Sequence, residues 1–240
     1  IYAQHGLGVG TDRAWNYATG YGIPKMIVVN ALDRENVAFD TVLNAAQEHF
    51  GRHVFPLSVP VNAGPGFNQV LDVLRNEIVT YATDGSGKYT EEPATGEWAE
   101  KVKELHRELI EHIAESDDTL MNKFFEQGTL SEEEFRAGIH AAVQKELFIP
   151  FFAASAENNI GVARLMDFIA KYGSSPVDRK NVPAIDANGN ETEVKLDSGE
   201  TVAYVFKTMS EAHFGELSFF RVYSGHVTTG LDLLNSDRKI

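Results

Sequence analysis

The feature that most constrains the fold is a short apolar stretch at residues 25–29, which ends in Ile27-Val-Val29. Pro24 precedes it, and β-branched residues in so short a run are typical of a buried strand. Residues 147–153 form a second short apolar run. Segments with helical periodicity separate the two runs, so we predict an α/β protein with a parallel sheet.

Periodicity and turn signals place the other elements. We expect helices from the glycine-rich turn at residues 6–11 to Gly20 or Gly22, capped by Thr11 or Asp12, and over residues 38–50, 98–113, 131–146 and 161–172. Residues 53–61, which Pro56 and Pro60 interrupt, are expected to form an edge strand, and residues 67–81 a short helix and a strand. After residue 178 we expect only β-structure, with a hairpin turn at residues 186–190 and strands at 201–207 and 216–223.

These patterns suggest three parts. The first part, residues 1–52 and 146–178, carries the two buried strands. The second, residues 53–145, has the sequence pattern of a compact α+β unit inserted between them. The third, residues 179–240, is the start of a β-unit and is too short to close a barrel. The chain begins at Ile1 and ends at Ile240 just after an expected strand, so we expect it to be part of a longer protein.

Composition limits the classes of function. The 240 residues include no cysteine, which excludes disulfides, thiolate metal sites and a cysteine nucleophile, and the eight histidines are not spaced as zinc ligands. The formal net charge of −14 argues against a general basic surface for nucleic acid, but a local RNA contact or a basic protein partner stays open. No run is long enough to span a membrane and no signal peptide is recognisable, so we expect a cytoplasmic protein without a membrane partner.

Polar residues follow both buried strands. Asn30 and Asp33 follow the first strand, and Ser155 and Ala156 follow the second. Ligands of open α/β sheets bind just beyond the carboxyl ends of strands. The Watson–Crick edge of guanine offers two donors, N1–H and the 2-amino group, beside the O6 acceptor, and one carboxylate can accept both donors. These residues are therefore candidates for recognising guanine.

Each residue has an expected role. Asp33 would accept from the two donors, the Ala156 N–H could donate to O6, the Ser155 hydroxyl could brace Asp33, and the Asn30 amide could hold the loop together. Adenine presents the opposite pattern and would be rejected. The alternative for residues 30–33 is an Asx-type turn that caps a strand end.

The motifs resemble those of the translational GTPases. Asn30-Ala-Leu-Asp33 is similar to the family's Asn-Lys-X-Asp guanine motif, and Ser155-Ala156 to its Ser-Ala motif. They lie much farther apart than in a minimal GTPase, which makes residues 53–145 an insertion, as in elongation factor G. The run from Phe214 to Gly225 is similar to the start of that factor's second domain, a β-barrel.

The resemblance implies the C-terminal part of a P-loop GTPase domain, α/β and doubly wound around a mainly parallel sheet, with an inserted α+β subdomain and the start of a β-barrel domain. It implies GTP or GDP as the ligand, with Mg²⁺ expected only in the full-length protein. The base would be bound by Asn30, Ala31, Asp33, Ser155 and Ala156. Ala31 replaces the family's Lys, whose stem lies along the base, so nucleotide binding should be weakened.

The residues that bind and cut the phosphates are not expected in this chain. Residues 85–88 resemble part of a phosphate loop, but Tyr89 stands in place of the required Ser or Thr and Ala82 in place of the first Gly. Their place within the insertion should also keep them far from the strand ends. We expect the P-loop, magnesium-binding and switch motifs before Ile1, so this chain alone should have no catalytic residue and no GTPase activity, whereas its parent should hydrolyse GTP.

By resemblance, the parent is a monomeric, ribosome-dependent GTPase that promotes tRNA–mRNA translocation during elongation, with the ribosome as its partner. A release factor or a tetracycline-resistance-type GTPase shares the two guanine motifs. A degenerate paralogue that binds the ribosome without efficient turnover is a third alternative, and Ala31 keeps it open.

Overall fold

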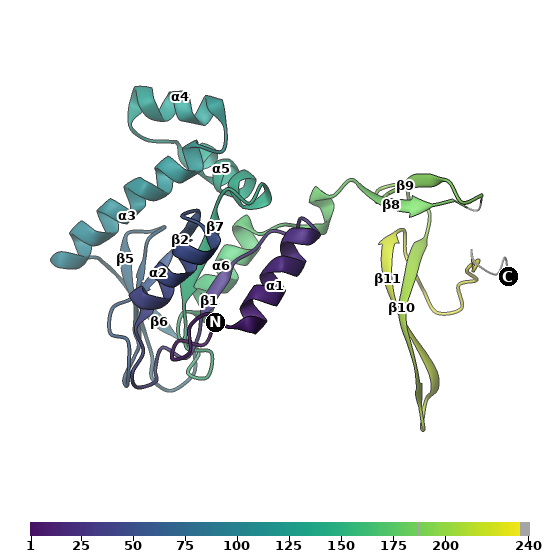
Figure 1. Ribbon diagram of the computed structural model, residues 1–240, viewed down its shortest axis with the longest axis horizontal. Helices are drawn as coiled ribbons and strands as arrows, with labels where there is room; N and C mark the ends of the chain where they lie inside the picture. Colours follow the sequence, from purple (N-terminus) through teal and green to yellow (C-terminus); the bar gives the residue numbers. More distant parts are fainter. Residues whose placement is uncertain (187, 236–240) are drawn as a thin grey trace. The chain divides into compact units, whose positions relative to one another are not determined.

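The computed structural model of the protein describes residues 1–186 and 188–235. The chain folds into two compact units, Ile1–Ser174 and a second that begins at Ser175 (Figure 1). Residue 187 of the predicted turn at 186–190 and residues 236–240 of the predicted β-unit lie outside the described residues.

The first unit mixes helices with two sheets. Its elements are α1 (Val9–Gly20), β1 (Ile27–Val29), α2 (Phe39–Phe50), β2 (Val54–Pro56), β3 (Ser58–Pro60), β4 (Gln69–Asp72), β5 (Glu77–Tyr81), β6 (Tyr89–Pro93), α3 (Glu97–Ala114), α4 (Asp118–Gln127), α5 (Glu132–Gln144), β7 (Ile149–Ala153) and α6 (Val162–Tyr172).

The predicted parallel sheet is confirmed. Its order is β1-β7-β2, with Val28 opposite Phe152 and Phe55 opposite Pro150. All five residues of the central strand β7 are buried, which explains their continuous apolar run. At the other side of β1, the Asn30 N–H donates to the carbonyl of Ile1 (2.8 Å), so the first residues of the chain extend the sheet.

A four-stranded antiparallel sheet, β3-β4-β5-β6, packs beside the parallel one. The segment at residues 53–61, predicted as one edge strand, forms an edge strand of each sheet, because the chain passes from one to the other at Leu57. The Leu57 N–H donates to Phe151 in the parallel sheet (2.9 Å), and the Leu57 carbonyl accepts from Val73 beside the antiparallel sheet (3.0 Å). The division of this unit at residues 53 and 145 stays a prediction.

The helix predicted within residues 67–81 is wrong, because this segment is the β4–β5 hairpin. The turn is fixed by Asp72, whose Oδ1 accepts from the N–H groups of Leu74 (3.0 Å) and Arg75 (3.2 Å), and by Asn76 at φ 59°. Strand β6 was not predicted, since its five residues are all exposed and show no apolar alternation.

The helices follow their end signals. Ser131 and Glu134 form a capping box at the start of α5, and Gly128 ends α4 in the left-handed conformation. Helix α1 begins at Val9 after Gly8, earlier than the predicted caps, because the Thr11 hydroxyl reaches back to the Gly8 N–H (3.4 Å) from within the helix. The long helix α3 contacts β4, α4 and α5, and Figure 1 shows it beside the last two.

The second unit is β-rich, as predicted. After a short 3₁₀ turn (Pro176–Asp178) it contains β8 (Asn181–Ile185), β9 (Glu191–Lys195), β10 (Val202–Glu211) and β11 (Gly215–Ser224). These strands pair as two antiparallel hairpins, β8-β9 and β10-β11. The predicted fold class, an α/β unit followed by β-structure, is therefore confirmed. Within residues 1–186 and 188–235, no helix has the length and apolar character that crossing a membrane requires.

Candidate functional site

The two loops that follow β1 and β7 are adjacent, as expected for neighbouring parallel strands. The Ala154 N–H donates to the carbonyl of Val29 (2.9 Å), and the Leu32 N–H donates to the carbonyl of Ala154 (3.3 Å). These backbone bonds continue the β1–β7 pairing beyond the strand ends. Tertiary structure thus brings together two motifs that are far apart in the sequence.

The side chain of Asn30 ties these loops. Its Oδ1 accepts a hydrogen bond from the Ala156 N–H at 2.8 Å. The predicted role of the Asn30 amide is therefore present, and the amide does not cap its own turn as in the Asx-turn alternative. It also follows that the Ala156 N–H, the predicted donor to guanine O6, is engaged by Asn30 in this structure.

Replacing Asn30 with Ala should loosen this tie. We expect a loss of about 1 kcal/mol in the free energy of unfolding, because an average hydrogen bond contributes about this much net. Asn30→Asp keeps an acceptor at the same place and is the matched control. Urea unfolding of both variants tests the prediction, and equal stabilities for Asn30→Ala and the parent would contradict it.

Asp33 presents an unsatisfied carboxylate oxygen. Its side chain is 12% exposed, and Oδ2 lies 3.6 Å from Nε of Arg34. The other oxygen, Oδ1, is buried and has no hydrogen-bond partner. Buried polar atoms are nearly always hydrogen-bonded, so such an atom needs an explanation. A ligand that brings N–H donors would satisfy it.

The expected brace between Ser155 and this Asp33 oxygen is not formed. Ser155 is fully buried, and its hydroxyl accepts from the Asn158 N–H at 3.4 Å within its own loop. Ser155 therefore stabilises the turn that follows β7. The reason is geometric: a short side chain at the start of a tight turn reaches the backbone of that turn first.

An ion pair that sequence reasoning missed joins the loops at the surface. Arg34 follows the first motif and Glu157 follows the second, and their side chains form an ion pair. Both are exposed, at 45% and 71%, so water and salt screen the pair. The available signal was the opposite charge of the residues that directly follow the two motifs.

Ala31 has an unusual backbone conformation. It lies at φ 66°, and it is only 8% exposed. Its carbonyl accepts from the Arg34 N–H (3.3 Å), which closes a turn that contains Asp33. Non-glycine residues rarely adopt this left-handed region, so the surrounding structure imposes the conformation.

The loop at residues 83–88 is not a phosphate loop, because it joins two antiparallel strands, β5 and β6, and not a strand and a helix. The expectation that it lies far from the strand ends is wrong. Asn159, in the loop after β7, donates from Nδ2 to the carbonyl of Gly85 (3.5 Å). The parallel and antiparallel sheets share one core, which brings the β5–β6 loop to this edge.

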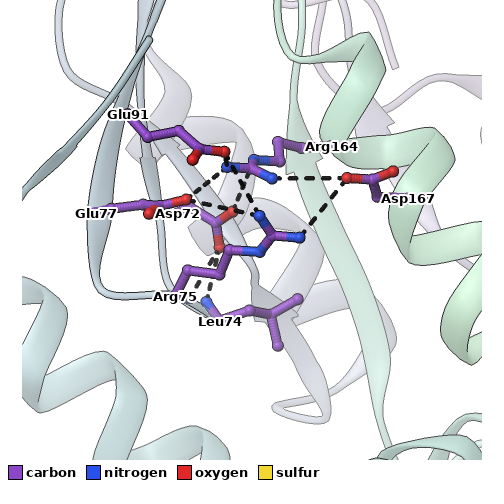
Figure 2. Close-up of polar contacts among 7 residues, drawn as sticks. All are labelled: Asp72, Leu74, Arg75, Glu77, Glu91, Arg164 and Asp167. Atoms are coloured by element: carbon purple, nitrogen blue, oxygen red, sulfur yellow. Dashed lines mark hydrogen bonds and ion pairs between the residues drawn. The ribbon is translucent and has the colours of Figure 1, made fainter. Parts of the chain in front are cut away.

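A second missed feature is a cluster of charges around Arg164 of α6 (Figure 2). The Arg164 side chain is 6% exposed and faces the end of β4, the start of β5 and the middle of β6. It pairs with four carboxylates: Asp72 (3.2 Å), Glu77 (2.5 Å), Asp167 (3.6 Å) and Glu91. Its guanidinium also lies over the ring of Tyr89 at 5.1 Å.

This cluster attaches the antiparallel sheet to α6. Burial raises the pKa of Asp72, and the charge of Arg164 and the N–H groups of Arg75 and Leu74 oppose that rise. Burial also raises the pKa of Glu77, again opposed by Arg164. Arg75 adds ion pairs with Glu91 (3.5 Å) and Asp167 (3.7 Å) at the rim. The sequence signal was weak: a single arginine on the apolar face of a helix.

Comparison with known proteins identifies the family. Residues 1–175 match the family described as the elongation factor Tu GTP binding domain. The crystal structure of ttk003000868 from Thermus thermophilus is similar, with a TM-score of 0.80 and 28% sequence identity, over 98% of this chain and 32% of that one. The chain therefore spans about a third of the length of that protein. With the family match covering most of its length, the chain belongs to the family of the elongation factor Tu GTP-binding domain, the nucleotide-binding domain of translational GTPases.

Proposed function

We propose that the chain is the guanine-nucleotide-binding part of a ribosome-dependent translational GTPase that promotes tRNA–mRNA translocation. The base would lie at the edge formed by the loops after β1 and β7, against Asn30, Ala31, Asp33, Ser155 and Ala156. The observation that carries the proposal is the buried Oδ1 of Asp33 without a donor, at the carboxyl end of a parallel sheet.

The chemistry of the site fits guanine better than adenine. Guanine would bring N1–H and the 2-amino group to the carboxylate of Asp33, which satisfies the buried oxygen and places two donors on one anion. Adenine has an acceptor at N1 and would leave the same oxygen unpaired in a nearly buried place. The free-energy difference between a satisfied and an unsatisfied buried group gives the selectivity.

Turnover would require residues outside this chain. We propose that the phosphate loop, the switch segments and the Mg²⁺ ligands precede Ile1, so the chain alone binds the base weakly and hydrolyses nothing. Among the described residues, no cluster of three or more His, Asp or Glu side chains is arranged to hold a metal ion. The complete protein would act as a monomer on the ribosome in the cytoplasm. Elongation factor G is the proposed relative because it carries an insertion between the same two motifs.

A second candidate is a paralogue that binds the ribosome but turns over GTP poorly. The observation in its favour is Ala31, which has no stem to lay along the base at the position of the family's Lys. A release-factor or tetracycline-resistance-type GTPase stays the alternative within the same class.

Calorimetric titration of the protein, extended to include the residues before Ile1, tests the proposal. We expect one GDP bound per chain and no heat from ADP. Absence of GDP binding would overturn the GTPase assignment. Ribosome-stimulated GTP hydrolysis then separates the two candidates, because the paralogue would bind ribosomes without stimulated turnover.

A further inference from the structure

The segment at residues 155–160, here called the guanine loop, is a closed turn. Ser155 and Ile160 exchange two backbone hydrogen bonds, at 3.0 and 2.9 Å, and the Asn159 N–H donates to the carbonyl of Ala156 (3.3 Å). Asn159 adopts the left-handed conformation at φ 55°. The backbone of Asn159 thus helps to fix the position of Ala156, whose N–H in turn donates to Asn30.

The β5–β6 loop (residues 83–88) is held in one shape by its own hydrogen bonds. The Ala82 N–H donates to the carbonyl of Lys88 (2.8 Å), and the Ser86 N–H donates to Oδ1 of Asp84 (2.9 Å). Hydrogen bonds from Ser86 hold the pKa of Asp84 below its ordinary value, because they favour the ionised carboxylate. The loop therefore presents a fixed surface.

Asn159 fits against this surface at Gly87. Its Nδ2 donates to the carbonyl of Gly85 at 3.5 Å. A methyl group on Gly87 would lie 2.4 Å from Nδ2 of Asn159 and 2.9 Å from its Cγ, so the Asn159 side chain would have to move out of its present position. The same group on Gly85 would meet no heavy atom within 4 Å.

We propose that Asn159 is a positioning residue through which the β5–β6 loop supports the guanine loop, so that this hairpin of the insertion sets how long a guanine nucleotide stays bound. The inference rests on the proposed function, namely that the guanine loop contacts the base. The path of contacts runs from the Gly85 carbonyl, beside Gly87, to Asn159, and then to Ala156 and Asn30. Base selectivity should depend chiefly on the carboxylate of Asp33, which lies outside this path.

Gly87→Ala and Gly85→Ala form a matched pair of variants. Both glycines are left-handed, at φ 70° and 73°, so both substitutions impose the same backbone strain, and they differ in whether the new methyl group meets Asn159. The measurement is the dissociation rate of a fluorescent GDP analogue from the protein extended before Ile1. We expect Gly87→Ala to release the analogue about five to ten times faster than Gly85→Ala, within the range of coupling energies between contacting residues. The preference for GDP over ADP and the thermal midpoint should be the same in both variants.

Asn159→Gly completes the cycle, because glycine keeps the left-handed conformation and removes the side chain. We expect the Asn159→Gly variant to release the analogue faster than the parent. When Gly87→Ala is added to Asn159→Gly, its effect on the release rate should be no larger than that of adding Gly85→Ala. Equal release from Gly87→Ala and Gly85→Ala, in a protein that binds GDP, would overturn the inference and leave the proposed function standing. If Gly87→Ala does not fold, Asn159→Gly decides, and release at the parental rate overturns the inference. A parent protein that binds no GDP would instead remove the proposed function, and the inference with it.

Discussion

Asp33→Asn is expected to change the base preference of the protein from guanine to xanthine nucleotides. The carboxamide would keep one acceptor but turn an NH₂ group towards the donors of guanine, in a place where the Asp33 side chain is only 12% exposed. Xanthine carries an oxygen where guanine carries its 2-amino group, so the same NH₂ group would find an acceptor. We expect GDP affinity to fall on the order of a thousandfold, within the range seen when a site built for hydrogen bonding loses its partner.

The measurement is competition of GDP and XDP against a fluorescent nucleotide, in the parent and the variant. Glu35→Gln is the control, because it removes one negative charge from an exposed position of the same loop. The control should bind GDP like the parent. Parental GDP affinity in Asp33→Asn would show that Asp33 does not read the base.

Arg164→Met is expected to destabilise the first unit by about 3–5 kcal/mol, the usual effect of removing one partner from a buried ion pair. Met retains much of the volume of the side chain, so the loss measures the charge more than packing. Asp72, whose side chain is 8% exposed, would be left without its closest cation, and β4 and β6 would lose their ion pairs with Arg164 of α6. Guanidinium unfolding at neutral pH gives the difference in the free energy of unfolding.

Arg75→Met is the matched control. Arg75 pairs with Glu91 and Asp167 of the same cluster, but its side chain is 38% exposed, and pairs of this kind contribute about 0–1 kcal/mol. Equal effects of the two substitutions would mean that the burial of Arg164 is not what matters. In the Arg164→Met variant the Asp72 carboxylate is a buried charge without its partner. Adding Asp72→Asn removes that charge and should recover part of the lost free energy of unfolding.

The deficit of Arg164→Met should depend on pH in a defined direction. Burial raises the pKa of Asp72 in the folded state, and Arg164 opposes this rise, so the variant has a still higher folded pKa. A carboxyl group with a raised folded pKa is most favourable to folding below its unfolded pKa, and this advantage is lost as the pH rises through the folded value. The deficit should therefore be largest at neutral pH and smaller in mild acid.

Much of the fold could be predicted because its signals are local. Residues 25–29 and 147–153 are short apolar runs of the kind that is typical of a buried strand, and each contains a strand of one parallel sheet. Helix ends depend on a few neighbouring residues. In the structure α4 ends at Gly128, and α5 begins at the capping box of Ser131 and Glu134. The prediction of a helix within residues 67–81 was wrong because no pattern of apolar residues in this segment signals the turn at Asp72 or the pairing of β4 with β5.

The candidate site, like the fold, has features that could be predicted from the sequence and features that could not. Parallel strands end at the same edge of a sheet, and this rule predicted that four residues lie together at one edge: Asn30, Asp33, Ser155 and Ala156. The hydrogen-bond partners of these residues could not be predicted from that rule. The Ala156 N–H goes to Asn30, the Ser155 hydroxyl goes to Asn158, and one oxygen of Asp33 is left without a partner.

The parallel sheet and the helix ends could be inferred from the sequence because periodicity and capping act over a few neighbouring positions, and the residues at the sheet edge could be inferred because parallel strands end at the same edge. Two contacts became visible in the three-dimensional fold alone: the β5–β6 loop touches the guanine loop at Asn159, and Arg164 pairs with carboxylates from three strands and its own helix. These contacts join residues that are distant in the chain, and their partners are chosen by the packing of the two sheets against one core, a property that no local pattern encodes.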